Sequence, residues 1–358
     1  MSETSSGERL KRFGLGLLTL ILFVFALQIL RDAGSTLGPR LNESLRGFVT
    51  GEPSALGASW LASYLLMNGS VVAAVALTFF EQAAVNFTEL FMMLTGSRLG
   101  AAGIIVAVGA VDYFQKRAFT LRKACSMGVL VFVVTHLQTI PAALLGYLPA
   151  KLVPDGVGAL LGFSRARLPM PEGIGAITEG VVDVLGPPVS LIAGVLVLLA
   201  ALKTFDQITD GVDLGAIRDR YFEFLTNRWW SFLFGLVLTS ITLSVGFSLA
   251  VVVPLYNRGF VENREVIPYV MGANIGTLFD TILVALFVHV PGGLAAVLLF
   301  VLSTGAVTLL FLFRHEKFAR LSVLLADWTV REHWRFMLFL VSLAVVPTLL
   351  FATNLPWL

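Results

Sequence analysis

The run WWSFLFGLVLTSITLSVGFSLAVVVPLYN, residues 229–257, is uncharged and longer than one transmembrane helix requires. About 20 apolar residues suffice for one span. Small and polar residues break the run at Ser244-Val245-Gly246, and each half is then too short to cross. The run PSALGASWLASYLLMNGSVVAAVALTFF, residues 53–80, is broken in the same way at Asn68-Gly69-Ser70. We therefore predict two re-entrant helical hairpins, because irregular backbone at membrane depth is tolerated where protein or water surrounds it. One long tilted helix in each run is the alternative.

The composition of the whole chain indicates the same class of protein. Hydrophobic residues make up 57% of the 358 residues and charged residues only 13%, with a net charge of +2. Soluble proteins carry about 25% charged residues, so a cytosolic enzyme, a disordered chain and a collagen-like fibre are excluded. The near-neutral charge gives no support for nucleic-acid binding. The lone Cys125 excludes a disulfide scaffold and a Cys-based metal cluster. The prediction is an all-α polytopic membrane protein.

Further apolar segments and the placement of Lys and Arg predict the topology. The remaining uncharged runs are 13–30, 124–150, 184–202, 281–313 and 336–358; the fourth is split by the turn Pro291-Gly292-Gly293. With 84–112 and 262–290 each crossing once, the chain has seven crossings. The segments that are then cytoplasmic carry 16 Lys and Arg and the external ones carry 6, which places the N-terminus in the cytoplasm of a cell-membrane protein. We interpret 13–30 as an uncleaved first helix, not a signal peptide.

An internal repeat relates the two broken runs. The interval from the first break, at Met67, to the second, at Leu243, equals the interval between the glycine motifs Gly96-Ser97-Arg98-Leu99-Gly100 and Gly272-Ala273-Asn274-Ile275-Gly276. Three crossings and a hairpin in each copy invert the second copy relative to the first, each copy also containing a broken helix. Inverted repeats of this kind are typical of secondary transporters that bind substrate at the repeat interface. A duplication without transport is the alternative.

At these residues the chain resembles the sodium/phosphate cotransporter family. In each repeat that family has a Gln-Ser-Ser-Ser stretch followed, at the separation that joins Leu243 to Gly272 here, by Gly-Ala-Asn-Ile-Gly-Thr-Thr. The second copy matches this motif from Gly272 to Thr277 and departs at Leu278. The first copy is more divergent, with Arg98 in place of the motif's asparagine. The resemblance implies a membrane transporter that takes phosphate and sodium.

The chain also departs from the family where the ligands are expected. Both family glutamines are replaced by apolar residues, Met67 and Leu243, and four of six serines are absent. An amide offers two donors and an acceptor, whereas Met and Leu offer nothing useful to a hard ion. The resemblance therefore supports the fold more strongly than the substrate.

Polar residues near the breaks and motifs form the predicted site. An intramembrane arginine is costly and is a functional candidate, and Arg98 suits bidentate binding of phosphate or carboxylate. A structural ion pair of Arg98 with Glu89, Asp112 or Asp280 is the alternative. Asn274 can supply an oxygen to sodium or a donor to an anion, or only cap a helix. The predicted substrate-binding residues are Asn68, Gly69, Ser70, Arg98, Ser244, Gly246, Ser248 and Asn274, and the predicted ion-binding residues are Asn274, Thr277 and Asp280.

The remaining polar features suggest structural roles. His136 and Gln138, inside one apolar run, are expected to form interhelical hydrogen bonds, and no histidine spacing indicates a metal site beyond sodium. Residues 314–335 mix basic and apolar residues and predict an amphipathic helix on the inner membrane surface. The predicted division is 1–12 cytoplasmic, 13–150 repeat 1, 151–183 external linker, 184–313 repeat 2, 314–335 amphipathic segment and 336–358 final transmembrane helix.

These observations predict an ion-coupled secondary transporter and not an enzyme. The chain has no ATP-binding lysine motif, no Gly-x-Ser-x-Gly and no His-Glu-x-x-His. Sodium-dependent symport of inorganic phosphate is the leading hypothesis, with no cofactor other than sodium as a possible coupling ion. Transport of another anion, use of another coupling ion, and a non-transporting regulatory or scaffold protein are the alternatives.

Overall fold

The computed structural model describes residues 6–115, 121–152, 173–210, 227–243, 245, 248–249, 262–288 and 291–353. These residues are almost entirely helical and contain no strand. In chain order the helices are α1 (Ser6–Phe48), α2 (Glu52–Leu66), α3 (Gly69–Glu81), α4 (Phe87–Gln115), α5 (Leu121–Leu152), α7 (Ile174–Leu185), α8 (Pro187–Asp210), α10 (Arg228–Thr242), α12 (Asn263–Gly276), α13 (Leu278–Val288), α14 (Pro291–Phe313), α15 (His315–Arg331) and α16 (His333–Ala352). The all-α prediction is confirmed for the described residues.

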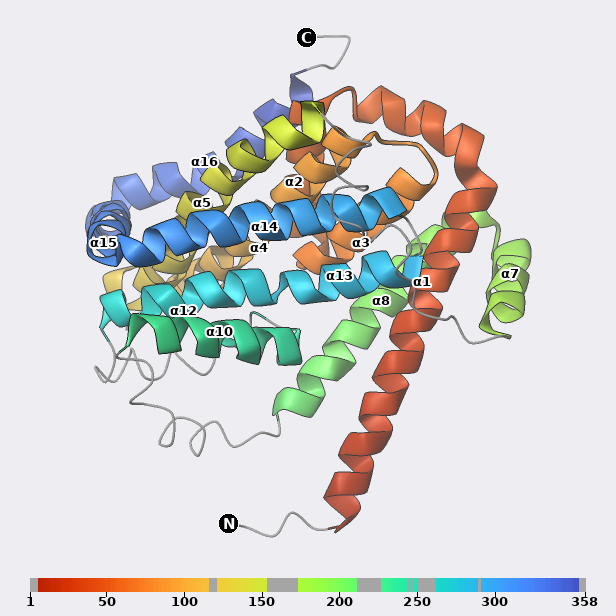
Figure 1. Ribbon diagram of the computed structural model, residues 1–358, viewed down its shortest axis with the longest axis horizontal. Coiled ribbons are helices and arrows are strands. Elements are labelled where there is room, and N and C mark those ends of the chain that lie inside the picture. Colours follow the sequence, from red (N-terminus) through yellow and green to blue (C-terminus); the bar gives the residue numbers. More distant parts are fainter. Residues whose placement is uncertain are drawn as a thin grey trace.

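Seven helical segments of the described chain are long and apolar enough to cross a membrane. They are 14–36, 87–107, 125–152, 187–204, 264–287, 292–313 and 333–352, and each overlaps one predicted crossing. In Figure 1, α12, α13, α14 and α5 run side by side, α15 lies across one end of them, and α1 and α8 cross together at a steep angle. Two segments differ from the expected connections, because α1 continues to Phe48 and α7 forms a helix within the predicted external linker.

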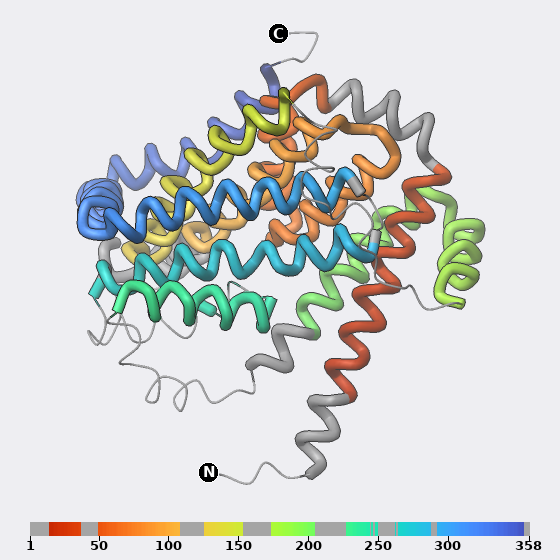
Figure 2. The backbone as a smooth tube through the Cα atoms, viewed as in Figure 1, coloured from red at the N-terminus to blue at the C-terminus, as the bar shows by residue number. Residues whose placement is uncertain are grey.

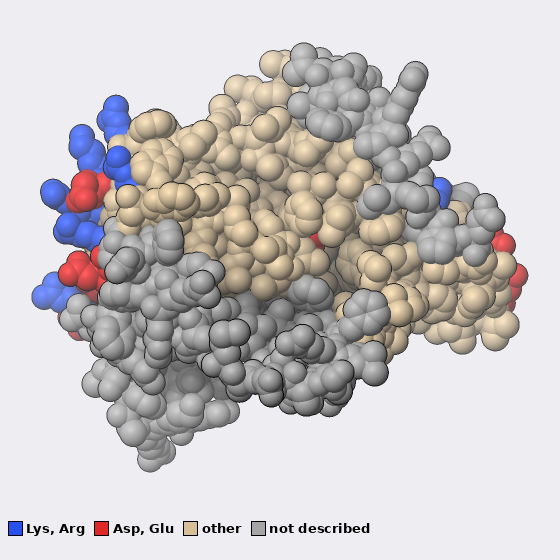
Figure 3. Space-filling view, turned by 60° about the horizontal axis from the view of Figure 1, so that its bottom comes forward, with Lys and Arg blue, Asp and Glu red and all other residues tan. Residues whose placement is uncertain are grey.

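Charged side chains lie at the ends of this bundle. Figure 3 shows Lys, Arg, Asp and Glu gathered at two opposite ends of the visible face, with an almost uncharged surface between them. At one end α15 contributes Lys317, Arg320 and Glu316, and Arg264 at the start of α12 pairs with Glu316 at 3.5 Å. An uncharged belt between charged ends is the distribution required of a protein that spans a bilayer.

The two long uncharged runs are both interrupted where the sequence predicts. Helix α2 ends at Met67 with φ of 51°, and α10 ends at Leu243 with φ of 50°. A left-handed conformation is uncommon for a residue with a side chain, and here it occurs at equivalent positions of the two copies. Residues 53–80 are therefore two helices and not one long one. In the second run, Ser244 and Gly246 lie outside the described residues.

Helix α4 packs on α2 in the same register as α12 packs on α10. The backbone of α4 at Gly100 lies so close to α2 that an added Cβ would be 2.6 Å from Trp60 O. At Gly276 the corresponding distance, to Leu236 O, is 2.5 Å. The step from Gly100 to Gly276 along the chain equals the step from Trp60 to Leu236, and both equal the step between the two breaks. The glycines of both motifs therefore serve close helix packing, which small residues favour in membranes.

The starts of α4 and α12 are also built alike. Glu89 accepts a hydrogen bond from Asn86 N at 2.8 Å, and Glu265 accepts one from Glu262 N at 2.9 Å. These capping interactions begin both helices at equivalent positions and satisfy backbone N–H groups that have no helical partner.

One part of the fold prediction is wrong, because the first repeat contains no broken helix at its glycine motif. Helix α4 continues without interruption through Gly96 and Gly100, whereas α12 and α13 are separated at Thr277. Ala101 and Ala102 follow the first motif and favour helix. In the second motif the Thr277 hydroxyl donates to Ala273 O at 2.8 Å, a side-chain bond that commonly bends helices.

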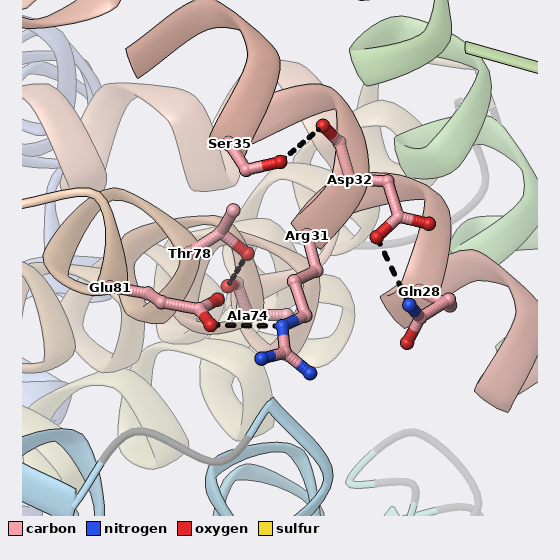
Figure 4. A network of polar contacts seen from close by, with 7 residues as sticks. All are labelled: Gln28, Arg31, Asp32, Ser35, Ala74, Thr78 and Glu81. Atoms are coloured by element: carbon pink, nitrogen blue, oxygen red, sulfur yellow. Dashed lines mark hydrogen bonds and ion pairs between the residues drawn. The ribbon is translucent and has the colours of Figure 1, made fainter. Parts of the chain in front are cut away.

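A polar network ties α3 to the neighbouring helix α1 (Figure 4). Arg31 Nε of α1 lies 3.0 Å from Glu81 Oε1 at the end of α3. Asp32 accepts from Gln28 at 3.0 Å and from Thr178 of α7 at 2.6 Å. The network anchors the end of α3, a short helix that packs against α1, α4 and α13 (Figure 2).

Candidate functional site

A cavity of about 270 Å³ lies where the two breaks and the two glycine motifs meet. Its polar lining residues are Asn68, Ser70, Arg98, Thr135, Thr139, Asn274, Thr277 and Thr304. The two breaks also line the cavity with less polar residues, which are Met67 and Gly69 in the first break and Leu243 and Val245 in the second. Residues that are far apart in sequence are thus brought to one cavity between the two predicted copies.

The start of α3 forms one wall of this cavity. Asn68 precedes the helix with extended backbone, and its Oδ1 accepts hydrogen bonds from Ser70 N at 2.9 Å and Val71 N at 3.1 Å. Asparagine is a preferred residue at this position because its short side chain reaches these two donors. Gly69 packs against α4, where a Cβ would lie 2.5 Å from Ser97 O. The positive end of the α3 dipole therefore faces the cavity.

Arg98 reaches the same cavity from α4. Gly96 and Gly100 face α2, and Arg98, two residues from each, is on the opposite side of the helix. The Arg98 residue is 7% exposed, its Nε lies 3.5 Å from Ser97 Oγ, and its Nη2 is buried without a hydrogen-bond partner. A buried guanidinium keeps its charge in proteins and offers five donors. Arg98 therefore brings a positive charge to the cavity wall and keeps one donor without a partner.

The Asp280 carboxylate, at the start of α13, is the acidic group that interacts with Arg98. Asp280 is 1% exposed; its Oδ1 accepts from Thr281 at 2.8 Å, and its Oδ2 is buried without a hydrogen-bond partner. It interacts electrostatically with Arg98 and with the Ser70 hydroxyl, but it is not among the cavity-lining residues. Of the three carboxylates considered for Arg98, Glu89 instead caps α4, and the Asp112 side chain lies outside the described residues.

Asn274 lines the cavity but is held by α5. Its Nδ2 donates to Gln138 Oε1 at 2.8 Å and to Thr135 Oγ1 at 3.0 Å. Gln138 Nε2 in turn donates to Thr308 Oγ1 of α14 at 2.6 Å and to Met271 O of α12 at 3.1 Å. This network joins three helices and fixes the orientation of the Asn274 amide. Gln138 thus forms the interhelical hydrogen bonds that its position in an apolar run predicts, whereas the same prediction is wrong for His136, whose Nδ1 bonds Phe132 O of its own helix at 2.9 Å.

Of two further residues predicted for the site, Thr277 lies at the cavity and Ser248 does not. Thr277 lines the cavity beside Asn274. Ser248 does not line it; this residue is fully buried, with its hydroxyl 2.7 Å from both Thr239 Oγ1 and Tyr269 OH. The expectation that Ser248 lies at the cavity is therefore wrong. Ser244 and Gly246 lie outside the described residues.

Three threonines in the cavity wall were not singled out from the sequence. Thr135 and Thr139 come from α5 and Thr304 from α14. All three lie within uncharged runs, where threonine is tolerated because its hydroxyl can bond the preceding turn of its own helix, as Thr304 does with Phe300 O at 2.7 Å. Their spacing along the chain carries no signal that these helices face the breaks of the hairpins.

Comparison with known families gives one match. Residues 197–327 match the model of the Na+/Pi-cotransporter family. The match supports membership of the sodium/phosphate cotransporter family. It covers the second repeat, including α10, α12 and the cavity residues Asn274 and Thr277. Searches of curated proteins and of solved structures gave no significant match.

The departures from the sodium/phosphate cotransporter motif fall directly on the cavity. Met67 and Leu243, which stand where the resemblance places the family's glutamines, both line it. Arg98, which stands at the motif's asparagine in the first copy, lines it as well. The site therefore keeps the family's position in the chain but has lost two amides and gained a positive charge.

Proposed function

We propose that this protein is an ion-coupled secondary transporter of an inorganic anion, with phosphate as its first candidate substrate. The observation that carries the proposal is the cavity between the two breaks, which Arg98 lines and at whose wall the Arg98 Nη2 is buried without a hydrogen-bond partner. A buried donor without a partner costs free energy, and an anionic oxygen would satisfy it. The family match supports transport and suggests phosphate as substrate and sodium as coupling ion.

Two structural features support alternating access by inverted copies. Helix α2 begins near the end of α16, where Gly57 packs against the Phe351 backbone. Helix α10 begins at the opposite end, near α15, where Ser231 Oγ donates to Glu265 O at 2.9 Å and Arg264 pairs with Glu316. Opposite starting ends are what two re-entrant hairpins from opposite membrane faces require. A substrate held between the hairpins would be exposed to one side or the other as they move.

The direct test is uptake of phosphate into proteoliposomes. We expect the reconstituted protein to accumulate radiolabelled phosphate in response to an ion gradient. Arg98→Ala should abolish this uptake, whereas Arg264→Gln, a change in an exposed ion pair outside the cavity, should preserve it. Equal uptake by liposomes with and without the wild-type protein would refute phosphate transport.

Other members of the same chemical class are distinguished in the same assay. Sulfate, arsenate or a small carboxylate that competes with phosphate, or is taken up in its place, would identify a different anion. A folded protein that transports and binds none of these anions would favour the regulatory or scaffold alternative, for which the loss of both family glutamines at Met67 and Leu243 is the motivating observation.

We also propose the membrane orientation that the placement of Lys and Arg predicts. With the N-terminus in the cytoplasm of a cell-membrane protein, α15 is cytoplasmic and α7 is external. On a background without Cys125, a cysteine at exposed Glu179 should react with an impermeant reagent in intact cells, and one at exposed Lys317 only after permeabilisation. The reverse result would invert the proposed topology.

A further inference from the structure

The charges at the cavity form an open pair instead of a closed ion pair. Arg98 and Asp280 interact electrostatically, yet Arg98 Nη2 and Asp280 Oδ2 both remain without hydrogen-bond partners among the described residues. The first residue comes from the first repeat and the second from the second repeat. Asp280 therefore interacts with the charge of Arg98 without occupying its Nη2 donor.

Of the three residues predicted to bind sodium, Asn274 and Thr277 line the cavity, whereas Asp280 does not. The Asn274 amide is turned toward α5, where it bonds with Thr135 and Gln138. The Asp280 carboxylate is instead beside Ser70 of α3 and Arg98 of α4. A sodium ion prefers several oxygen ligands, and one placed at Asp280 would also be repelled by the guanidinium. The described residues at this cavity thus do not fit a sodium ion as well as they fit an anion.

Arg98 brings a positive charge to the cavity itself. It is a permanent positive charge, it lines the cavity, and it is balanced by a carboxylate from the other repeat. In a sodium-dependent anion site, the bound cation supplies charge that the anion needs. Here the protein supplies that charge covalently, at the position where the resemblance places an uncharged asparagine.

We infer that Arg98 is a built-in cation and that the anion binds to this cavity without sodium. The inference rests on the proposed function in one respect, that the cavity binds an anion. If the inference is right, anion binding does not require the coupling ion. An ion that drives transport would then act on another step of the transport cycle.

The test is phosphate binding to the purified protein, measured by calorimetry in sodium gluconate and in choline gluconate. For the wild type we expect dissociation constants that agree within a factor of about two. Arg98→Asn should weaken binding in choline at least about tenfold, as expected for loss of a charge-assisted hydrogen bond. Arg98→Lys should bind more weakly than the wild type but remain independent of sodium, because it keeps the charge and loses the planar fork.

Two further variants control for folding. Arg98→Asn leaves Asp280 buried without its counter-charge, so the double variant Arg98→Asn with Asp280→Asn removes both charges and should recover stability without recovering affinity. Arg264→Gln, in an exposed ion pair with Glu316, should leave both stability and affinity unchanged.

The outcomes separate the inference from the proposed function. Phosphate binding that sodium strengthens tenfold or more in the wild type would overturn the inference and leave phosphate transport standing. Binding of sulfate or arsenate but not phosphate, equal in both salts and lost in Arg98→Asn, would replace the substrate and uphold the inference. Absence of binding for all three anions, or unchanged affinity in a folded Arg98→Asn protein, would overturn the role of Arg98.

Discussion

Replacing Gly276 by alanine tests whether the glycine motif is needed for helix packing. A Cβ at this position would lie 2.5 Å from Leu236 O, 2.9 Å from Thr239 Cβ and 3.0 Å from Ser240 N. Since Cβ atoms essentially never approach other atoms within 3.0 Å, α10 would have to move away from α12 to admit the methyl group. Two of the three obstacles are backbone atoms of a helix and cannot rotate aside. Overpacking of this kind costs about 1–3 kcal/mol.

Gly305→Ala is the matched control for this substitution. Gly305 is also inside a helix, α14, but an added Cβ there would meet nothing within 4 Å. Removing a glycine from a helix interior without a clash stabilises by about 0.5–1 kcal/mol. Thermal unfolding in detergent should therefore show a lower midpoint for Gly276→Ala and an equal or higher midpoint for Gly305→Ala. Gly100→Ala, the equivalent change in the first repeat, should behave like Gly276→Ala. If Gly276→Ala and Gly305→Ala were equally stable, the packing argument would be refuted.

Three other changes have defined outcomes. Asn68→Ala should lower the free energy of unfolding by about 0.5–2 kcal/mol, because α3 loses the side chain that accepts hydrogen bonds from Ser70 N and Val71 N. Chemical unfolding measures this difference, and a stability equal to that of the wild type would contradict it. Gln138→Leu should cost about 1–3 kcal/mol in the same assay, because Asn274 and Thr308 lose a buried partner, and no loss would mean that water replaces the amide. Burial lowers the pKa of His315 from 6.5, with Arg228 and Arg264 acting in the same direction and Glu316 opposing them. The unfolded chain therefore binds this proton at a higher pH than the folded protein does, so stability should fall as the pH drops below 6.5 and level off once the folded form is protonated. His315→Gln should remove this part of the pH dependence.

Much of the predicted site could be located from the sequence because its residues lie at helix breaks and glycine motifs that recur at a constant interval along the chain. The break at Met67–Ser70 and the residues Arg98, Asn274 and Thr277 follow from that spacing, and they all line one cavity. The prediction for Ser248 is wrong because its distance from the second break is short in sequence, while its hydroxyl bonds with Thr239 and Tyr269. Spacing along the chain predicts which residues are near a break but not which side of a helix they face.

Hydropathy and glycine spacing are properties of the chain alone, and they predict the class of protein, its seven apolar segments and the constant spacing of its internal repeat. The relation between Arg98 and Asp280 depends instead on how the helices pack. The two lie in different repeats, and no pattern of spacing distinguishes an ion pair from two separate sites. Packing between α3, α4 and α13 places them close enough to interact but leaves a polar atom of each without a partner. That arrangement arises from the relative positions of three helices, each held by different neighbours, and the proposed anion site depends on it.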